Sequence, residues 1–299
     1  MAKANIHVAI AILLHQQNVL VGWREAKQHQ GNKYEFPGGK VEANETPEQA
    51  CRREVLEEVG IDISEWYVFD FICHEYEDVI VHLHIFHAMV TEAQCECIQE
   101  PWTWYQRDAL LNLNFPKANS AMLQRLYWQP QLKISANLQD VKHLIDDQLL
   151  YWRTGFTAMH VQEVASLTDE QLSKLVLNVA LWSKLDNEYK HQIAAVHLKQ
   201  QQLLQLRKGD LTVGTRFIAA CHDVKSVLHA QEIGCDAVLL SPVKNTATHP
   251  DYSALGWTQF QAIANAVDIP VFALGGLSPM DLDIAQQHGA YGIAGIRSF

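Results

Sequence analysis

The stretch from residue 39 to residue 61, GKVEANETPEQACRREVLEEVGI, defines both ends of one helix from local signals alone. Thr46 suits the N-cap, Pro47 suits the first helical position, and Gln49 completes a capping-box pattern three residues after the cap. Gly60 stands where a glycine commonly ends a helix. The sequence therefore predicts a helix that begins at Pro47 and ends before Gly60.

Three carboxylates lie on one face of this predicted helix. Glu54, Glu57 and Glu58 have the spacing i, i+3 and i+4. Acids at this density repel one another unless a cation lies among them, and hard oxygen ligands suit Mg²⁺ or Mn²⁺ better than zinc. A Glu-rich helix is also typical of a solvated surface, so charge alone does not identify a site.

The spacing of the residues around these acids is more specific than their charge. Gly39, five residues, Glu45, seven residues and then REVLEEVGI from Arg53 to Ile61 resembles the Nudix box at every fixed position. The resemblance implies a domain that binds a divalent metal and cleaves a nucleoside diphosphate linked to another group. We therefore interpret this stretch as an enzyme site.

The same resemblance implies roles for single residues. Glu54, Glu57 and Glu58 become metal ligands, and Glu54 also orients or deprotonates a water molecule. Arg53 joins the catalytic set as the residue that orients the acids. The turn at residues 38–39 lets the backbone approach a ligand, so Gly39 is counted with the metal site.

Segments outside the box are similar to one branch of this family, the MutT-type 8-oxo-dGTP hydrolases. They are NKYEFPGGKVE at residues 32–42, ETPEQA at 45–50 and LNFPKAN at 113–119. The resemblance implies that the amide of Asn119 reads the purine edge with both a donor and an acceptor. It implies a nucleotide pocket that also includes Arg24, Phe36, Gly38 and Lys40.

One acid departs from the pattern of that branch. The branch carries Glu-x-Gln shortly before a Trp-rich strand, whereas this chain reads ECIQEPWTW at residues 96–104. Counting back from Trp104 places the expected acid at Ile98 and the expected glutamine at Glu100. Glu96 or Glu100 takes the role, or the three helix acids and water suffice. We include Glu100 as the candidate ligand.

The length and composition indicate a two-domain protein whose cysteines are reduced. Two domains are expected because 299 residues exceed one typical domain. Pro130 closes the predicted helix at 120–128, so we predict domains at residues 1–130 and 131–299. A net charge of −11 argues against a duplex nucleic-acid or anionic-membrane surface, but metal ions can still neutralise a nucleotide. The longest early apolar run, residues 8–14, is too short to span a bilayer. Six cysteines without a disulfide framework fit a cytoplasmic location.

The first domain is expected to be an α/β/α sandwich with a mixed sheet. We predict strands at residues 6–14, 18–23, 66–73 and 79–90, and a last helix at 120–128. His82 and His84 share one strand face and could bind a metal, although a polar strand face explains them more simply because no third ligand is placed.

The second domain is predicted to be a compact (β/α)₈ barrel like a TIM barrel. Eight apolar runs alternate with helical patterns, over about 169 residues against about 250 for this architecture. The predicted strands are Leu132–Ser135, Gly155–Val161, Leu175–Leu181, Ala194–Leu198, Thr215–Ala220, Ala237–Leu240, Val271–Leu274 and Gly292–Ile296.

Glycines after the last two predicted strands indicate a phosphate site. Such barrels often hold phosphate there on glycine backbone, which predicts a site at Gly275, Gly276, Gly295 and Arg297. Residues 213–299, with CHD at 221–223 and ALGGL at 273–277, resemble thiamine monophosphate synthase and the related thiazole tautomerase.

The earlier part of the barrel departs from that resemblance. HVQE at residues 160–163 stands where an arginine-rich motif is expected, and LKQ at 198–200 where Gly-Gln and an acid usually follow. Full synthase activity is therefore not expected. A tautomerase-like activity, a module that binds a thiazole or thiamine phosphate, and a structural barrel stay open, and binding or structure ranks above catalysis.

Taken together, the sequence predicts an Mg²⁺-dependent (or Mn²⁺-dependent) hydrolase that converts 8-oxo-dGTP to the monophosphate and pyrophosphate. Such an enzyme removes oxidised nucleotides before DNA synthesis and so limits mutation. One alternative is a Nudix hydrolase for a different nucleotide. Another is a thiamine-precursor sensor whose barrel regulates the hydrolase domain. The sequence does not determine the oligomeric state.

Overall fold

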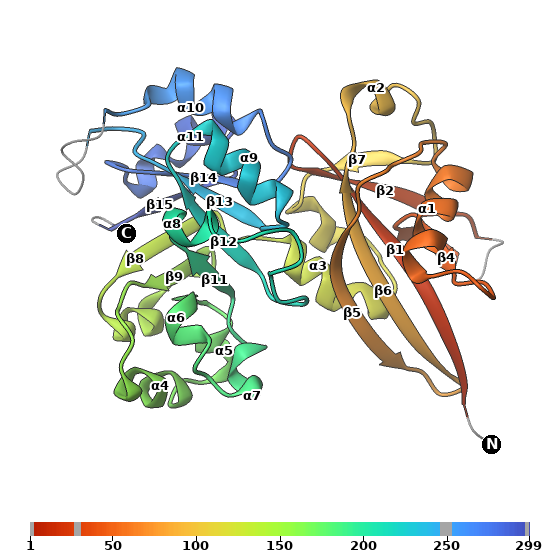
Figure 1. Ribbon diagram of the computed structural model, residues 1–299, viewed down its shortest axis with the longest axis horizontal. Helices are drawn as coiled ribbons and strands as arrows, with labels where there is room; N and C mark the ends of the chain where they lie inside the picture. Colours follow the sequence, from red (N-terminus) through yellow and green to blue (C-terminus); the bar gives the residue numbers. More distant parts are fainter. Residues whose placement is uncertain (1–2, 27–30, 246–252, 297–298) are drawn as a thin grey trace. The chain divides into compact units, whose positions relative to one another are not determined.

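The computed structural model describes residues 3–26, 31–245, 253–296 and 299 (Figure 1). The chain divides into two compact units, Met1–Trp128 and Gln129–Phe299. Within the described residues no helix is both long and apolar enough to cross a membrane.

The first unit is built on a seven-stranded mixed sheet. Its main path runs β3-β2-β1-β6-β5, with β4 paired to β1 and β7 paired to β2. β1 and β6 are parallel, and the other pairs are antiparallel. The strands are β1 (Ala4–His15), β2 (Asn18–Arg24), β3 (Lys33–Glu35), β4 (Gly38–Lys40), β5 (Tyr67–Glu75), β6 (Val79–Met89) and β7 (Thr103–Tyr105). The four strands predicted for this unit are confirmed within a few residues.

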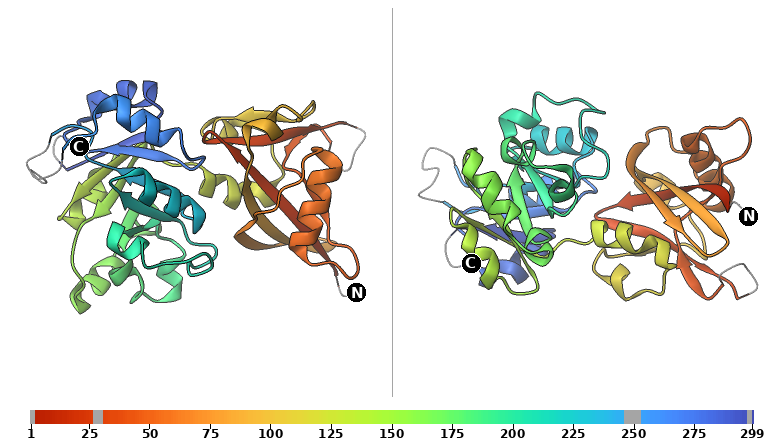
Figure 2. Two further views of the ribbon diagram at one scale, coloured as in Figure 1. Left: turned by 45° about the horizontal axis from the view of Figure 1, so that its top comes forward. Right: turned by 90° about the horizontal axis from the view of Figure 1, so that it is seen from below.

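Both faces of this sheet are covered, because the middle of β1 is apolar on both sides. Alternate residues of β1 enter two separate cores, one beneath α1 (Pro47–Glu58) and one beneath α3 (Ser120–Leu126). The two helices cover opposite faces of the sheet (Figure 2). The sandwich predicted for the first unit is therefore confirmed. Its helical segments are α1 (Pro47–Glu58), α2 (Glu92–Cys95), the 3₁₀ turns η1 (Ala109–Asn112) and η2 (Lys117–Asn119), and α3 (Ser120–Leu126).

Helix α1 follows its sequence signals. Thr46 Oγ1 accepts a hydrogen bond from Gln49 N at 3.2 Å, and Gln49 Oε1 accepts one from Thr46 N at 2.8 Å, which is the predicted capping box. Gly60 follows the helix with φ of +82°, in the left-handed region. Local sequence alone therefore determines where the helix begins and ends.

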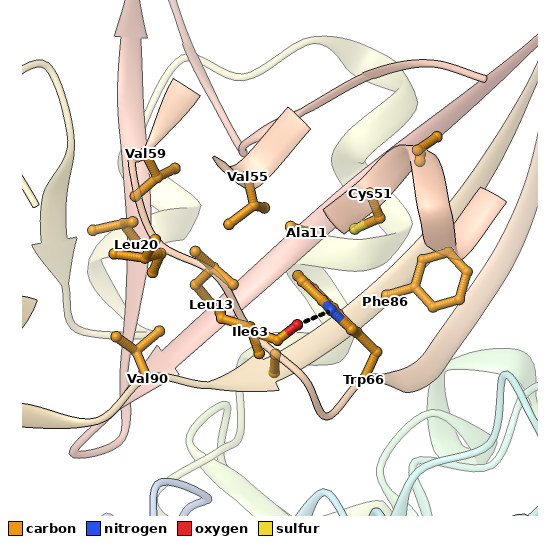
Figure 3. Packing of buried hydrophobic residues seen from close by; sticks show 14 residues of the cluster. Ala11, Leu13, Leu20, Cys51, Val55, Val59, Ile63, Trp66, Phe86 and Val90 are labelled. Atoms are coloured by element: carbon orange, nitrogen blue, oxygen red, sulfur yellow. Dashed lines mark hydrogen bonds between the residues drawn. The ribbon is translucent and has the colours of Figure 1, made fainter. Parts of the chain in front are cut away.

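The core beneath α1 sets which face of the helix points outward. Cys51 and Val55 are fully buried and pack toward Leu13 of β1 (Figure 3). Trp66 closes this core, and its Nε1 donates a hydrogen bond to Ile63 O at 3.0 Å. Because Val55 points into this core, its neighbour Glu54 points away from it, and the Glu54 carboxylate lies against Gly39 of β4.

The second unit is a closed barrel of eight parallel strands with helices around it (Figure 2), which confirms the predicted architecture. The strands are β8 (Gln131–Ser135), β9 (Gln148–Trp152), β10 (Leu175–Asn178), β11 (Ala195–Leu198), β12 (Phe217–Cys221), β13 (Ala237–Leu240), β14 (Val271–Leu274) and β15 (Gly292–Gly295). The α-helices are α4 (Ala158–Ala165), α5 (Asp169–Leu172), α6 (Val179–Trp182), α7 (Asn187–Lys190), α8 (Gln200–Leu203), α9 (Val224–Glu232), α10 (Gly256–Ala264) and α11 (Leu282–Gln287). Two 3₁₀ helices, η3 (Leu138–His143) and η4 (Pro279–Asp281), complete the elements.

The second predicted strand of the barrel is wrong. Residues 155–161 do not form a strand, because Thr157 caps helix α4 there and its Oγ1 accepts a hydrogen bond from His160 N at 3.3 Å. The strand is instead β9, QLLYW, in which every residue is buried. The third predicted strand is too long, since Asn178 ends β10 and caps α6 by accepting from Leu181 N at 3.0 Å.

Candidate metal and phosphate sites

Two glycines of β4 bring the backbone against the helix acids. Gly38 N donates a hydrogen bond to Glu58 Oε2 at 3.0 Å. A Cβ on Gly38 would lie 2.2 Å from Ala9 O, and a Cβ on Gly39 would lie 2.2 Å from Glu54 Oε1. Real Cβ atoms essentially never come so close, so neither position has room for a side chain.

Arg53 connects the acids of the box to one another. Its Nη2 donates to Glu45 Oε1 and its Nη1 to Glu54 Oε1, both at 2.8 Å. Nη2 also donates to Lys40 O at 3.2 Å, and Nη1 lies 3.4 Å from Glu57 Oε2. The hydrogen bond from Arg53 is the main reason why the pKa of Glu45 lies below its usual value. Arg53 therefore holds the loop before α1 against the first turns of the helix.

A further acid that the sequence did not indicate, Glu35 of β3, lies near the helix acids. The pKa of Glu58 is raised to about 7, first because surrounding protein excludes water and then because Glu54 and Glu35 repel its negative charge. The Gly38 amide and Arg24 act in the opposite direction. Arg24 also donates from Nε to Glu35 at 2.7 Å.

The donor set suits a hard divalent cation. Burial raises the pKa of Glu58 most, repulsion by Glu54 and Glu35 raises it further, and a cation would relieve that repulsion. Across the described residues, no three His, Cys, Asp or Glu side chains are already arranged as a metal-ligand set. Glu54 Oε1 accepts a hydrogen bond from Arg53 Nη1, and Glu58 Oε2 accepts one from Gly38 N. The side chain of Glu57 is 59% exposed and only loosely held by Arg53. Metal binding would therefore use the remaining carboxylate oxygen of Glu54 and of Glu58.

Glu100 does not contact the box acids in this structure. It is exposed, and within the described part of the chain no hydrogen bond or ion pair joins it to α1. Its neighbour Trp102 does reach α1, where Nε1 donates to Glu58 O at 2.8 Å. The role of Glu100 or of Glu96 as a ligand stays a prediction.

The residues predicted to bind the nucleotide differ in their exposure. Phe36 is 5% exposed and stacks on Phe115 with ring centroids 4.9 Å apart. Asn119 is 7% exposed at the start of α3, yet its side chain does not cap that helix. Its amide is therefore available to a ligand. Lys40 is exposed, and Arg24 is paired with Glu35.

His82 and His84 lie beside a third histidine that sequence reasoning did not place with them. His7 of β1 stacks on His82 with centroids 4.6 Å apart, and its Nδ1 lies 3.0 Å from His84 Nε2. Among the described residues, no three His, Cys, Asp or Glu side chains are arranged to hold a metal ion. We therefore interpret these histidines as a polar strand face.

In the barrel, a cavity of about 1010 Å³ lies at the carboxyl ends of the strands. Gly275, Gly276 and Gly295, three of the four residues predicted to bind phosphate, line it together. Gly275 and Gly276 have φ of +108° and +68°, and a Cβ on either would lie within 3.0 Å of residues 242–245. Arg297, the fourth, lies outside the described residues.

The correction to the second strand changes the interpretation of the barrel. Residues 160–163 belong to helix α4, so they do not stand where an arginine motif is expected. The residue directly after β9 is Arg153, which lines the cavity, as does Lys199 after β11. The arginine that was expected at residues 160–163 is absent there, but Arg153 stands directly after the second strand of the barrel and lines the cavity.

The two units correspond to two known families. Residues 8–125 match the family model of the NUDIX domain, and residues 154–299 match that of thiamine monophosphate synthase. With this fold and these sites, the chain belongs to the NUDIX family through its first unit and to the thiamine monophosphate synthase family through its second.

Individual relatives agree with this assignment. The chain is 40% identical over 101 residues to the 8-oxo-dGTP diphosphatase of Proteus vulgaris, which covers 33% of this chain and 88% of that protein. It is 33% identical over 129 residues to the 8-oxo-dGTP diphosphatase of Escherichia coli strain K12, covering 40% and 95%. It is 30% identical over 142 residues to the putative thiamine-phosphate synthase 2 of Aquifex aeolicus, covering 46% and 72%.

Proposed function

We propose that the first unit hydrolyses 8-oxo-dGTP to the monophosphate and pyrophosphate in the presence of Mg²⁺, and thereby removes an oxidised nucleotide before DNA synthesis. The observation that carries this proposal is the crowding of Glu35, Glu54 and Glu58 around the Gly38–Gly39 turn. Such a cluster attracts a divalent cation, and a cation attracts a triphosphate.

Each residue of the box has a distinct part in this proposal. Glu54, Glu57 and Glu58, with the backbone of Gly39, would hold Mg²⁺, and Mn²⁺ could replace it. A bound ion would neutralise the phosphates and lower the pKa of a water molecule. Arg53 keeps Glu54 in place through the 2.8 Å hydrogen bond.

Glu54 is the candidate to accept the proton of the attacking water, by its place in the box. The raised pKa of Glu58 belongs to the site without a cation, and a bound divalent cation would favour its ionised form, so Glu58 is proposed as a metal ligand only. The proposal uses positioning and charge stabilisation rather than a covalent intermediate.

The base would be read by Asn119. Its buried amide makes no capping hydrogen bond, so it can donate to and accept from a purine edge. The purine would enter beside Phe36, and the phosphates would extend toward Lys40 and Gly38. The relatives named 8-oxo-dGTP diphosphatase support this choice of substrate.

A substrate panel tests the proposal. Pyrophosphate release is measured with 8-oxo-dGTP, dGTP and the other common nucleoside triphosphates, each with Mg²⁺ and with EDTA. The proposal expects kcat/KM to be highest for 8-oxo-dGTP and hydrolysis to stop in EDTA. A higher kcat/KM for another nucleotide would support the alternative of a hydrolase with a different substrate.

The same reasoning extends to the cell compartment and to the barrel. All six cysteines are free, and three of them are buried, which suits a reducing cytoplasm. The second unit is proposed to bind a thiazole or thiamine phosphate in its cavity, as its family suggests. If that ligand changes the rate of nucleotide hydrolysis, the barrel acts as a sensor.

A further inference from the structure

One side chain from outside the box reaches the last residue of helix α1. Trp102 stands directly before β7, and its indole Nε1 donates a hydrogen bond to Glu58 O at 2.8 Å. Glu58 ends α1, and the last four carbonyl groups of a helix have no donor within the helix. Trp102 therefore supplies a hydrogen-bond donor to the end of α1 that carries the proposed metal ligands.

A second hydrogen bond holds the side chain of the same glutamate. Glu58 Oε2 accepts from Gly38 N of β4 at 3.0 Å. Glu58 is thus held at its carbonyl by the segment before β7 and at its carboxylate by β4. Because the backbone of the last helical turn sets the direction of the side chain, the hydrogen bond from Trp102 bears on where the carboxylate of Glu58 lies.

The indole of Trp102 is itself fixed by close packing on β2. A Cβ on Gly22 of that strand would lie 2.7 Å from Cζ3 and 2.8 Å from Cε3 of Trp102. Gly22 is not in the left-handed region, so the indole ring, and not the backbone, leaves no room for a side chain there. The ring also packs against the core beneath α1, as does Ile98.

The segment that carries Trp102 contacts the chain beyond α1 at another point. Gln94 Nε2 donates a hydrogen bond to Asp62 O at 2.8 Å. The Asp62 carboxylate in turn accepts two hydrogen bonds from Arg52 of α1, at 2.8 and 3.0 Å. Trp102 N closes the segment in a turn by donating to Gln99 O at 3.1 Å. Residues 94–102 therefore contact the C-terminal end of α1 and the chain that follows it.

We propose that Trp102 is a positioning residue for the metal site of the first unit. Its indole lies over Gly22 and holds the Glu58 end of α1, so that the helix acids meet a divalent cation in one geometry. Trp102 acts through Glu58 and does not touch the cation or the nucleotide. The role rests on the metal-dependent hydrolysis proposed above, and it adds a residue outside the box to that site.

Trp102→Phe tests the hydrogen bond, because it keeps an aromatic ring and removes the donor. Mn²⁺ binding is followed by electron paramagnetic resonance on the full chain without nucleotide. The variant should bind Mn²⁺ about tenfold more weakly, since residues that orient metal ligands contribute roughly 10- to 100-fold to metal affinity. Unchanged affinity would overturn the proposal.

The Mg²⁺ dependence of pyrophosphate release separates positioning from folding. In Trp102→Phe the Mg²⁺ concentration for half-maximal turnover should rise about tenfold, whereas turnover should approach that of wild type at saturating Mg²⁺. A loss of folded protein would instead lower turnover by the same factor at every Mg²⁺ concentration. That result would contradict a positioning role.

Trp66→Phe is the matched control. Trp66 packs in the same core, and its Nε1 also donates to a backbone carbonyl, that of Ile63 at 3.0 Å, which lies outside α1. The control should lower the melting temperature and retain the Mn²⁺ affinity of wild type. Equal weakening of Mn²⁺ binding in both variants would show that the stability of the core, and not the contact with Glu58, governs the site.

A pair of substitutions tests the contact between Trp102 and Gly22. Gly22→Ala should displace the indole and weaken Mn²⁺ binding about tenfold, as the loss of its hydrogen bond does. Trp102→Leu ends at Cδ, short of the ring atoms over Gly22, so adding Gly22→Ala to it should weaken binding no further. Additive losses would mean that residue 22 acts independently of Trp102, against the proposal.

The behaviour of wild type distinguishes this proposal from the proposed hydrolysis. Mn²⁺ binding is measured without nucleotide, so its outcome does not depend on which nucleotide is the substrate. If wild type does not bind Mn²⁺, the metal-dependent hydrolysis and the role of Trp102 are both refuted. If wild type and Trp102→Phe bind Mn²⁺ equally, only the role of Trp102 is refuted.

Discussion

A β-carbon on Gly39 would lie 2.2 Å from Oε1 of Glu54 and 2.3 Å from its carboxyl carbon. The turn before helix α1 and the first acid of the box can therefore share this space only if residue 39 has no side chain. The absence of a side chain at residue 39 leaves room for the Glu54 carboxylate. Arg53 Nη1 donates a hydrogen bond to Oε1 of the same carboxylate at 2.8 Å.

Gly39→Ala tests this relationship. Because the added carbon displaces the Glu54 carboxylate, kcat for 8-oxo-dGTP should fall roughly 10²-fold, since misplacement by about 1 Å can cost that much. Gly60→Ala is the control. A Cβ at residue 60 has nothing within 4 Å, so this variant loses some stability at its φ of +82° but should retain its turnover at 25 °C. Equal turnover of the Gly39 variant and wild type would contradict the account.

Glu54→Gln removes the charge and keeps the shape. Turnover should fall by about two to four orders of magnitude, because the carboxylate is proposed both to bind Mg²⁺ and to orient water. Steady-state kinetics with saturating Mg²⁺ measures this, and the circular dichroism spectrum should match wild type. If turnover is unchanged, Glu54 has no part in the mechanism.

The raised pKa of Glu58 predicts how stability changes with pH. Its pKa is about 7 in the folded chain against 4.5 for an ordinary glutamate, so folding favours the protonated form. This contribution is fully present below pH 4.5 and is lost as the pH rises through 7. In EDTA, the melting temperature of wild type should therefore fall relative to Glu58→Gln across this window.

Mg²⁺ should reverse part of this loss. At pH 8 the carboxylate of Glu58 is ionised, and a cation among the acids would relieve its repulsion by Glu54 and Glu35. Adding Mg²⁺ should raise the melting temperature of wild type more than that of Glu58→Gln. Parallel curves for the two proteins, with and without the metal, would show that Glu58 is not coupled to folding or to the cation.

Asn119→Ala tests base recognition. The amide is buried and does not cap α3, so its removal should affect binding of the base more than folding. The ratio of kcat/KM for 8-oxo-dGTP to that for dGTP should fall roughly tenfold, as expected for the loss of a two-point contact with a base edge. An unchanged ratio would mean that another residue reads the base.

Local sequence signals determined several elements that the structure contains. Helix α1 could be predicted to within a residue because Thr46, Gln49 and Gly60 specify its ends through contacts a few residues apart. The strands of the first unit could be predicted because apolar side chains recur along them. The positions of Gly275 and Gly276 followed from the general geometry of parallel barrels.

Features that depend on tertiary contacts could not be predicted in the same way. Glu35 lies near Glu58 only because β3 pairs with β2, and no local pattern indicates this. Strand β9 is buried throughout, so it lacks the alternation that marks a half-exposed strand. The run after it, residues 155–161, has apolar residues, but Thr157 caps a helix there. Because the second strand was predicted at residues 155–161 and not at 148–152, Arg153 was not predicted to line the cavity.

The central claim is that the acids of α1 hold a divalent cation, and Mn²⁺ binding followed by electron paramagnetic resonance tests it most directly. Wild type is compared with Glu54→Gln, Glu57→Gln and Glu58→Gln at pH 8, with and without a non-hydrolysable nucleotide analogue. The account predicts that wild type removes free Mn²⁺ from solution and that each variant binds it at least tenfold more weakly. Equal binding by wild type and all three variants would contradict it.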